Sequence, residues 1–134
     1  MGKEKDMPKK KITTRSAKNK GARFQKIIAE YISKITGIPN GKDELIQSRE
    51  MGQSGVDVKL IGEAKDTFPF AVECKNCEKW SLPSWIKQAK SNIGDFKTWL
   101  LFCKKNNEDP VVVMDADKFF EMYKLIVEWE LGEK

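Results

Sequence analysis

The spacing of apolar residues along the chain predicts helices and strands in alternation. From Ala22 to Ile35, large apolar side chains recur every three or four positions, which is typical of an amphipathic helix, and "TGIPNG" then ends it. Val56, Val58 and Leu60 alternate with less apolar neighbours, as residues of a half-buried strand do. After the first helix we expect three strands, at residues 45–49, 55–61 and 68–74.

The next part of the chain predicts a shorter helix and two more strands. Residues 84–93 indicate a helix that Ser84 opens after Pro83, and strands are expected at residues 99–103 and 111–114 around the turn "KKNNEDP". With a final helix, the order is helix, three strands, helix, two strands, helix. This order predicts an α/β fold in which helices flank one mixed sheet.

The last predicted helix follows an aspartate cap, either Asp115 or Asp117. Its large apolar side chains face one way, and they are Phe119, Phe120, Tyr123, Ile126, Val127 and Leu131. We expect this face to pack in the core. The alternative is a dimer surface, to which Trp129 and Leu131 would add.

Positive charge is concentrated at the start of the chain. Residues 1–20 contain eight Lys or Arg and two acidic residues, net +6, whereas residues 21–134 contain seventeen against eighteen, net −1, and the total is +5. We expect residues 1–20 to be a basic flexible arm, suited to a polyanion or only to solubility, and residues 21–134 to form one domain. With no run of eighteen apolar residues and no apolar signal segment at the start, a soluble cytoplasmic protein is expected.

The three cysteines do not make a convincing metal site. Cys74 and Cys77 form one CxxC pair, but a structural zinc site needs four ligands, and the sequence offers neither a second pair nor any histidine. A redox pair is the other alternative. We interpret all three thiols, including Cys103, as reduced.

The candidate chemistry lies in the hairpin of residues 55–61 and 69–75. If its turn is centred near Lys65, Asp57 is directly opposite Glu73, with Cβ atoms about 4.5–5.5 Å apart. Like charges in that position are destabilising, and a hard divalent cation such as Mg²⁺ would remove the conflict. Lys75 shares the face of Glu73 and could orient or deprotonate a nucleophile. The alternative is a solvated face with a surface salt bridge.

These segments resemble a known nuclease motif. "GVDVKLI" followed by "FAVECKN" is similar to the PD-(D/E)XK pattern, with Asp57, Glu73 and Lys75 in its three places. "KGARFQ", "SREMGQSGVDV", "FPFAVECKNCEKW", "WIKQAKSN" and "LLFCKKNNEDPVVVM" resemble, in the same order, a phage-encoded family of PD-(D/E)XK endonucleases. That family is similar to the archaeal-type Holliday junction resolvases, and the resemblance covers residues 20–121.

The resemblance implies a restriction-endonuclease-like fold, dependence on Mg²⁺ or Mn²⁺, DNA as substrate and often a homodimer. By this match Asp57, Glu73 and the backbone carbonyl of Cys74 would hold the metal. Lys75 would serve the nucleophile, and Gln88 would hydrogen-bond the water or the phosphate. All of them belong to residues 21–134, which would be the nuclease domain.

One position departs from the resolvase pattern. Archaeal resolvases carry a glutamate on the first helix where this chain has Gln25, and a neutral amide is a poorer metal ligand than a carboxylate. Glu30 does not replace it, because the helical rotation of 100° per residue turns Glu30 about 140° away from Gln25. We count Gln25 among the catalytic candidates and leave the number of metals open.

Several residues are expected to contact DNA. Ser54 and Gly55 match a loop that lets the DNA backbone approach, and the basic "KKNN" turn could contact phosphates. The expected contacts are Lys18, Lys20, Arg23, Arg49, Ser54, Gly55, Asn76, Lys104 and Lys105.

These features favour a metal-dependent DNA endonuclease of phage or prophage origin, selective for branched DNA. It would act in the cytoplasm of the bacterial host, with no membrane partner. Two alternatives stay open. The protein could be a nickase or end-processing nuclease, or a catalytically weak module that binds DNA on the same fold, which Gln25 would favour.

Overall fold

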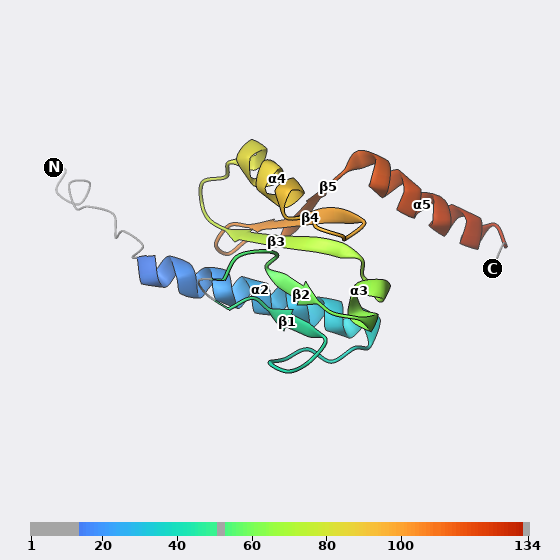
Figure 1. The fold of residues 1–134 in the computed structure, drawn as a ribbon. Helices are drawn as coiled ribbons and strands as arrows, with labels where there is room; N and C mark the ends of the chain where they lie inside the picture. Colours follow the sequence, from blue (N-terminus) through green and yellow to red (C-terminus); the bar gives the residue numbers. More distant parts are fainter. Residues whose placement is uncertain (1–13, 51–52, 133–134) are drawn as a thin grey trace.

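A five-stranded mixed sheet lies between helices in a computed structural model that describes residues 14–50 and 53–132 (Figure 1). The strands lie in chain order: β1 (Ile46–Ser48), β2 (Val58–Leu60), β3 (Phe70–Asn76), β4 (Thr98–Lys104) and β5 (Val111–Met114). β3 and β4 are parallel and the other neighbours antiparallel. The parallel pair needs a crossover, which α4 (Leu82–Ser91) supplies. The expected α/β order is confirmed.

Helix α2 (Thr14–Thr36) covers one face of the sheet. Phe24, Ile28 and Ile32 are buried in the same cluster as the strand residues Val72 and Cys74. Their spacing of four residues brings them onto one side of the helix, as the sequence pattern predicts. The first expected helix is therefore confirmed, with a longer N-terminal end.

Helix α4 covers the opposite face. Its buried residue Ala89 packs in a cluster with Trp99, Leu101 and Cys103 of β4. Successive side chains of a strand point to opposite faces, and Glu73 is the register partner of Leu101. Glu73 therefore points to the α4 side, whereas its neighbours Val72 and Cys74 point to α2.

The start of α2 differs from the expected arm boundary at residue 20. The helix begins at Thr14 and continues through that boundary, so residues 14–20 are helical. This stretch contains good helix formers such as Ala17, Lys18 and Lys20, but no large apolar residue whose spacing could reveal the helix. Residues 1–13 of the expected arm lie outside the described residues.

The connection between β2 and β3 is a short helix, α3 (Glu63–Thr67), where a simple turn was expected. The expected register is nevertheless present, because Val58 pairs with Val72 about a centre at residue 65. β3 begins at Phe70, two residues later than expected, since α3 and the following Pro69 occupy the intervening chain.

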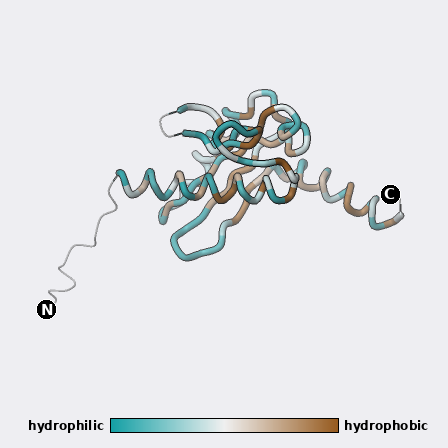
Figure 2. Tube along the Cα trace, turned by 90° about the horizontal axis from the view of Figure 1, so that it is seen from below, coloured by the Kyte–Doolittle hydropathy of each residue, from teal (hydrophilic) through white to brown (hydrophobic). Residues whose placement is uncertain are grey.

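Helix α5 (Ala116–Glu130) does not pack in the core, so that expectation is wrong. Asp115 is its cap, and the Asp115 side chain accepts a hydrogen bond of 3.1 Å from the Lys118 backbone N–H. Among the described residues, none of α5 is buried, and the helix projects beyond the sheet (Figures 1 and 2). Within the described ranges, no helix combines the length and the apolar character that crossing a bilayer requires.

The α2 packing can be tested by one substitution. Phe24 is 1% exposed, so Phe24→Ala should lower the free energy of unfolding by about 3–5 kcal/mol, through lost apolar burial and a residual cavity. Ile27→Ala is the matched control, because Ile27 is on the same helix but 41% exposed, and should cost less than about 1 kcal/mol. Urea unfolding followed by circular dichroism measures both, and equal costs would contradict this packing.

Candidate active site

Two buried carboxylates lie side by side at the centre of the sheet. Asp57 comes directly before β2 and is 3% exposed, while Glu73 lies within β3 and is 1% exposed. The pairing of Val58 with Val72 places Asp57 next to Glu73. Burial raises the pKa of Glu73, and the nearby charge of Asp57 raises it further. The structure thus brings together the two acids that the sequence predicts as neighbours.

Asp57 is held by partners on both sides. Its Oδ2 accepts a hydrogen bond of 2.7 Å from the backbone N–H of Cys74. Its Oδ1 accepts two from Arg49, at 3.0 Å from Nε and 2.6 Å from Nη2. The guanidinium therefore compensates the charge of a carboxylate that water does not reach. Arg49 was expected to contact DNA, and no sequence pattern predicts this ion pair.

The negative charge of Glu73 is less well compensated than that of Asp57. Burial, followed by repulsion from Asp57, raises the pKa of Glu73 from 4.5 to about 7. A hydrogen bond from Asn92, and the positive charges of Lys75 and Arg49, act in the opposite direction. Near neutral pH a large fraction of Glu73 is therefore protonated, and a bound cation would favour its ionised form.

Asn92 is a site residue that the sequence analysis missed. It is the C-cap of α4, and its Nδ2 donates a hydrogen bond of 3.2 Å to Glu73 Oε2. Asn92 follows Gln88 by four residues, so both lie on one side of the helix. That spacing from a predicted site residue is the signal that could have identified it.

Lys75 lies on the same face of β3 as Glu73, as expected from strand alternation. Its Nζ is 5.8 Å from the centroid of the Trp85 ring on α4. Trp85, Gln88 and Asn92 share one side of α4, with Trp85 next to Lys75 and Asn92 next to Glu73. The exposed side chain of Gln88 comes between them along the helix, a placement that suits its expected role.

Gln25 comes from a different direction. It is half-buried on α2, the helix that packs against Val72 and Cys74 on the face opposite Glu73. No hydrogen bond found among the described residues joins Gln25 to Asp57 or Glu73, and its role stays a prediction. Glu30 is exposed on the same helix.

Basic residues gather at the end of the sheet where β3 and β4 terminate. Because these strands are parallel, Lys75 and Lys104 approach the same edge. Lys20 on α2 reaches this edge as well, with Nζ 4.0 Å from Glu78 Oε2, and Glu78 also accepts a 2.6 Å hydrogen bond from the Asn106 backbone N–H. The first half of α2, the loop after β3 and the turn after β4 thus meet at one end of the molecule, on the left in Figure 1.

The other residues that were expected to contact DNA differ in their exposure and surroundings. Lys105 Nζ lies 5.8 Å from the Trp80 ring centroid. Ser54 and Gly55 are exposed, and Gly55 has φ of +100°, a conformation that L side chains rarely adopt. The Oδ1 of Asn76 is buried and finds no hydrogen-bond partner among the described residues. Lys18 and Arg23 are exposed on α2.

The donor set fits a hard divalent cation. Mg²⁺ binds oxygen, commonly through one or two carboxylates, and completes its shell with water and substrate phosphate. Asp57 and Glu73 are such a pair, and the Cys74 carbonyl directly follows Glu73 in β3. No group of three or more His, Cys, Asp or Glu side chains suited to a metal was found in residues 14–50 and 53–132.

The thiols do not contribute to this set. Cys74, Cys77 and Cys103 are all free. Burial raises the pKa of Cys74 well above its usual range and that of Cys103 to about 11. Both therefore stay protonated at neutral pH, whereas a metal ligand must be the thiolate.

Comparison with known proteins agrees with this geometry. Residues 16–129 match a family model described as "Phage putative PDDEXK endonuclease". The chain belongs to this phage PD-(D/E)XK endonuclease family. Its five-stranded mixed sheet, flanked by helices, is the restriction-endonuclease-like fold that the sequence predicts. Neither the search of curated proteins nor that of solved structures returned a match.

The raised pKa of Glu73 makes the stability of this PD-(D/E)XK protein depend on pH. The folded protein binds the Glu73 proton more tightly than the unfolded chain, so the burial penalty is absent below about pH 4.5 and grows as pH rises to about 7. Without metal, Glu73→Gln should therefore stabilise the fold at pH 8, by up to about 3 kcal/mol, and have little effect at pH 4.5.

Urea unfolding at the two pH values, with chelator present, measures the difference. Glu108→Gln is the control, because Glu108 is exposed in the turn after β4. An equal effect of Glu73→Gln at both pH values would show that Glu73 has no raised pKa.

The Arg49 ion pair generates a separate prediction. Removing one partner of a buried pair leaves the other charge uncompensated, so Arg49→Met should lower the free energy of unfolding by about 3 kcal/mol at pH 7. Lys59→Met, a half-buried lysine on β2, is the control and should cost less than about 1 kcal/mol. If thermal and urea unfolding give the same small cost for both variants, Arg49 does not compensate Asp57.

Proposed function

We propose that the protein is a Mg²⁺- or Mn²⁺-dependent endodeoxyribonuclease of phage or prophage origin that cuts branched DNA, with the four-way junction as its preferred substrate. The observation that carries this proposal is the buried pair of Asp57 and Glu73 at the centre of the sheet, with Lys75 next along β3 toward its basic end. Membership of the phage PD-(D/E)XK endonuclease family supports the nuclease part.

Asp57, Glu73 and the backbone carbonyl of Cys74 would hold the metal. When bound, the ion would act as a Lewis acid toward the phosphate and lower the pKa of the attacking water. Glu73 has to be ionised to take part. Since its pKa is about 7 without metal, metal binding should release protons and strengthen as pH rises from 6 to 8.

The other residues would position the attacking water, the phosphate and the Glu73 carboxylate. Hydrolysis forms a bond from a water oxygen to phosphorus and breaks one P–O ester bond, and the leaving oxygen takes up the proton that the water loses. The Lys75 ammonium can orient that water or hold a non-bridging phosphate oxygen. Gln88 can donate a hydrogen bond to the same groups from α4. Asn92 is a positioning residue, since it contacts Glu73 and thereby fixes the direction of the carboxylate.

The basic end of the sheet would be the surface that binds the DNA substrate. Lys20, Lys104 and Lys105 can contact phosphates there without reading the sequence, together with the exposed Lys18 and Arg23 of α2. The preference for junctions rests on the similarity to archaeal-type resolvases. Two symmetric cuts across a junction need two active sites, so the proposal includes a homodimer with twofold symmetry, acting in DNA recombination in the cytoplasm of the host.

Two other functions are the alternatives. A monomer, with one active site, would suit a nickase or an end-processing nuclease better. The neutral Gln25, in the place of the resolvase glutamate, favours a catalytically weak module that binds DNA on this fold.

Cleavage of labelled substrates tests the proposal. With Mg²⁺, the protein should cut a four-way junction at two symmetric positions and a linear duplex of the same sequence at least about 10-fold more slowly. Asp57→Ala should reduce junction cleavage by at least about 100-fold, because one ligand of the metal is lost. Asp43→Ala, an exposed aspartate in the loop after α2, is the matched control and should leave the rate unchanged.

The pattern of products separates the candidates. Equal cutting of junction and duplex would overturn the junction preference, and single nicks would indicate the nickase. Salt-sensitive DNA binding without any cleavage in Mg²⁺ or Mn²⁺ would indicate the binding module.

A further inference from the structure

We propose that α5 of each chain docks into an apolar groove between α2 and β5 of a second copy, so that two chains exchange their last helices. The inference deepens the homodimer of the proposed function by naming the surface that forms it. It rests on two uncovered apolar surfaces of the described chain, one convex and one concave.

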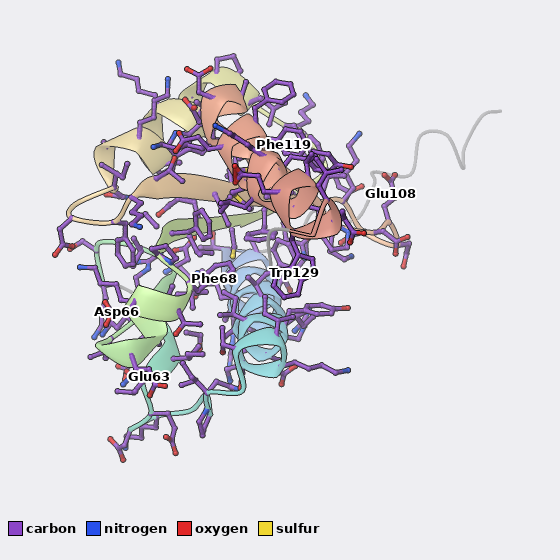
Figure 3. All side chains as sticks on the ribbon, turned by 90° about the vertical axis from the view of Figure 1, so that its right-hand side faces the viewer. Glu63, Asp66, Phe68, Glu108, Phe119 and Trp129 are labelled. Carbon is purple, nitrogen blue, oxygen red and sulfur yellow. The ribbon has the colours of Figure 1, made fainter. Side chains whose placement is uncertain are left out.

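The convex surface is the apolar face of α5. Seen from the side on which α5 projects, the helix runs from Phe119 near its start to Trp129 near its end (Figure 3). Eight large hydrophobic residues of α5 are exposed, and Phe120 is 67% exposed. A helix of 15 residues is marginally stable in water unless its apolar face is packed. We therefore expect another surface to cover it.

The chain's own sheet does not cover this face. α5 borders a hollow above Pro69 and Thr98 with the side that carries Glu121, Leu125 and Glu128. At 100° per residue, Phe119, Phe120, Tyr123, Ile126 and Val127 lie on the remaining sides of the helix, largely turned away from that hollow. Only Asp115 separates β5 from α5, and its capping bond fixes how the helix leaves the sheet. Another molecule has to cover the apolar face.

The concave surface is a groove of about 420 Å³ on the main body. α2 contributes Ile28, Tyr31, Ile32 and Ile35, whose spacing of three and four residues is typical of a seam between helices. Tyr31 is 60% and Ile35 71% exposed, so this seam is largely open, although Met122 of the same chain's α5 also borders the groove. β5 forms the other wall with Val111 and Val112.

Area and symmetry favour a second copy as the occupant. Between Ile28 and Ile35, the part of α2 that lines the groove has one acid, Glu30, and one basic residue, Lys34, so its net charge does not oppose α5, which contains four acids and two basic residues. A fully covered aromatic side chain buries about 150–250 Å², so the five large side chains turned away from the hollow, each about half exposed, offer on the order of 500 Å². Each copy would bury both this face and its groove, and together they approach the roughly 800 Å² that a standard stable interface removes from each partner. Helix and groove are on one chain, so a twofold axis satisfies both in both copies.

Light scattering of the full chain during gel filtration tests the exchange. The wild-type protein should be a dimer at about 10 µM, which requires a Kd of about 1 µM or below. Ile126→Lys on α5 and Ile35→Glu in the groove should each weaken dimerisation by at least about 100-fold, because each would bury an unpaired charge. Ile61→Glu, a similarly exposed position after β2, should remain dimeric.

Mixing the two variants makes the test specific. One contact of the mixed dimer is wild type, and the other brings the new lysine against the new glutamate, so the mixture should form dimers that neither variant forms alone. Circular dichroism should show that all variants are folded, since the changed side chains are 45–71% exposed. A monomeric wild type, a dimeric Ile35→Glu protein, or a mixture that stays monomeric would overturn the proposal.

The nuclease proposal can fail separately. If the dimer behaves as expected but junctions stay uncut in Mg²⁺ and Mn²⁺, the helix exchange stands and the nuclease activity falls. If junctions are cut symmetrically but α5 and the groove tolerate both substitutions, the dimer uses another surface.

Discussion

Two like charges buried side by side are the constraint on which the site depends. Asp57 and Glu73 are both removed from water at the centre of the sheet, where their repulsion costs free energy. The chain compensates the first with Arg49 and the N–H of Cys74, and the second, among the described residues, with Asn92 and more distant charges. A proton on Glu73, or a cation between the two acids, relieves what remains. Such a buried pair lowers the stability of the fold, but its oxygen atoms are suited to binding a divalent metal.

The periodic part of this arrangement could be predicted from the sequence. Strand alternation placed Glu73 and Lys75 on one face, and the centre of the hairpin placed Asp57 opposite Glu73, because register follows from the turn even when that turn contains α3. The last helix was also predictable, and the sequence narrowed its cap to Asp115 or Asp117, of which the structure has Asp115. Each of these depends on residues that are near one another along the chain or related by a fixed repeat.

Some features of the structure could not be predicted from the sequence. They depend on contacts between distant segments of the chain, or they lack the apolar repeat that a prediction needs. Arg49 reaches Asp57 from the chain after β1, and nothing in its neighbourhood distinguishes it from an arginine that contacts DNA. The early start of α2 has no apolar repeat to reveal it. The apolar face of α5 has the periodicity of a core helix, and periodicity alone cannot tell a face covered by the same chain from one left for a partner.

The central claim is that Asp57 and Glu73 form one cation site whose ionisation is coupled to the metal. Calorimetric titration of Mn²⁺ into the protein at pH 7, in two buffers with different ionisation enthalpies, measures metal uptake and proton release together. The account predicts saturable binding that releases protons from Glu73, and loss of that release, with much weaker binding, in Glu73→Gln. Binding of unchanged affinity in Glu73→Gln, or uptake with no proton release in the wild type, would contradict it.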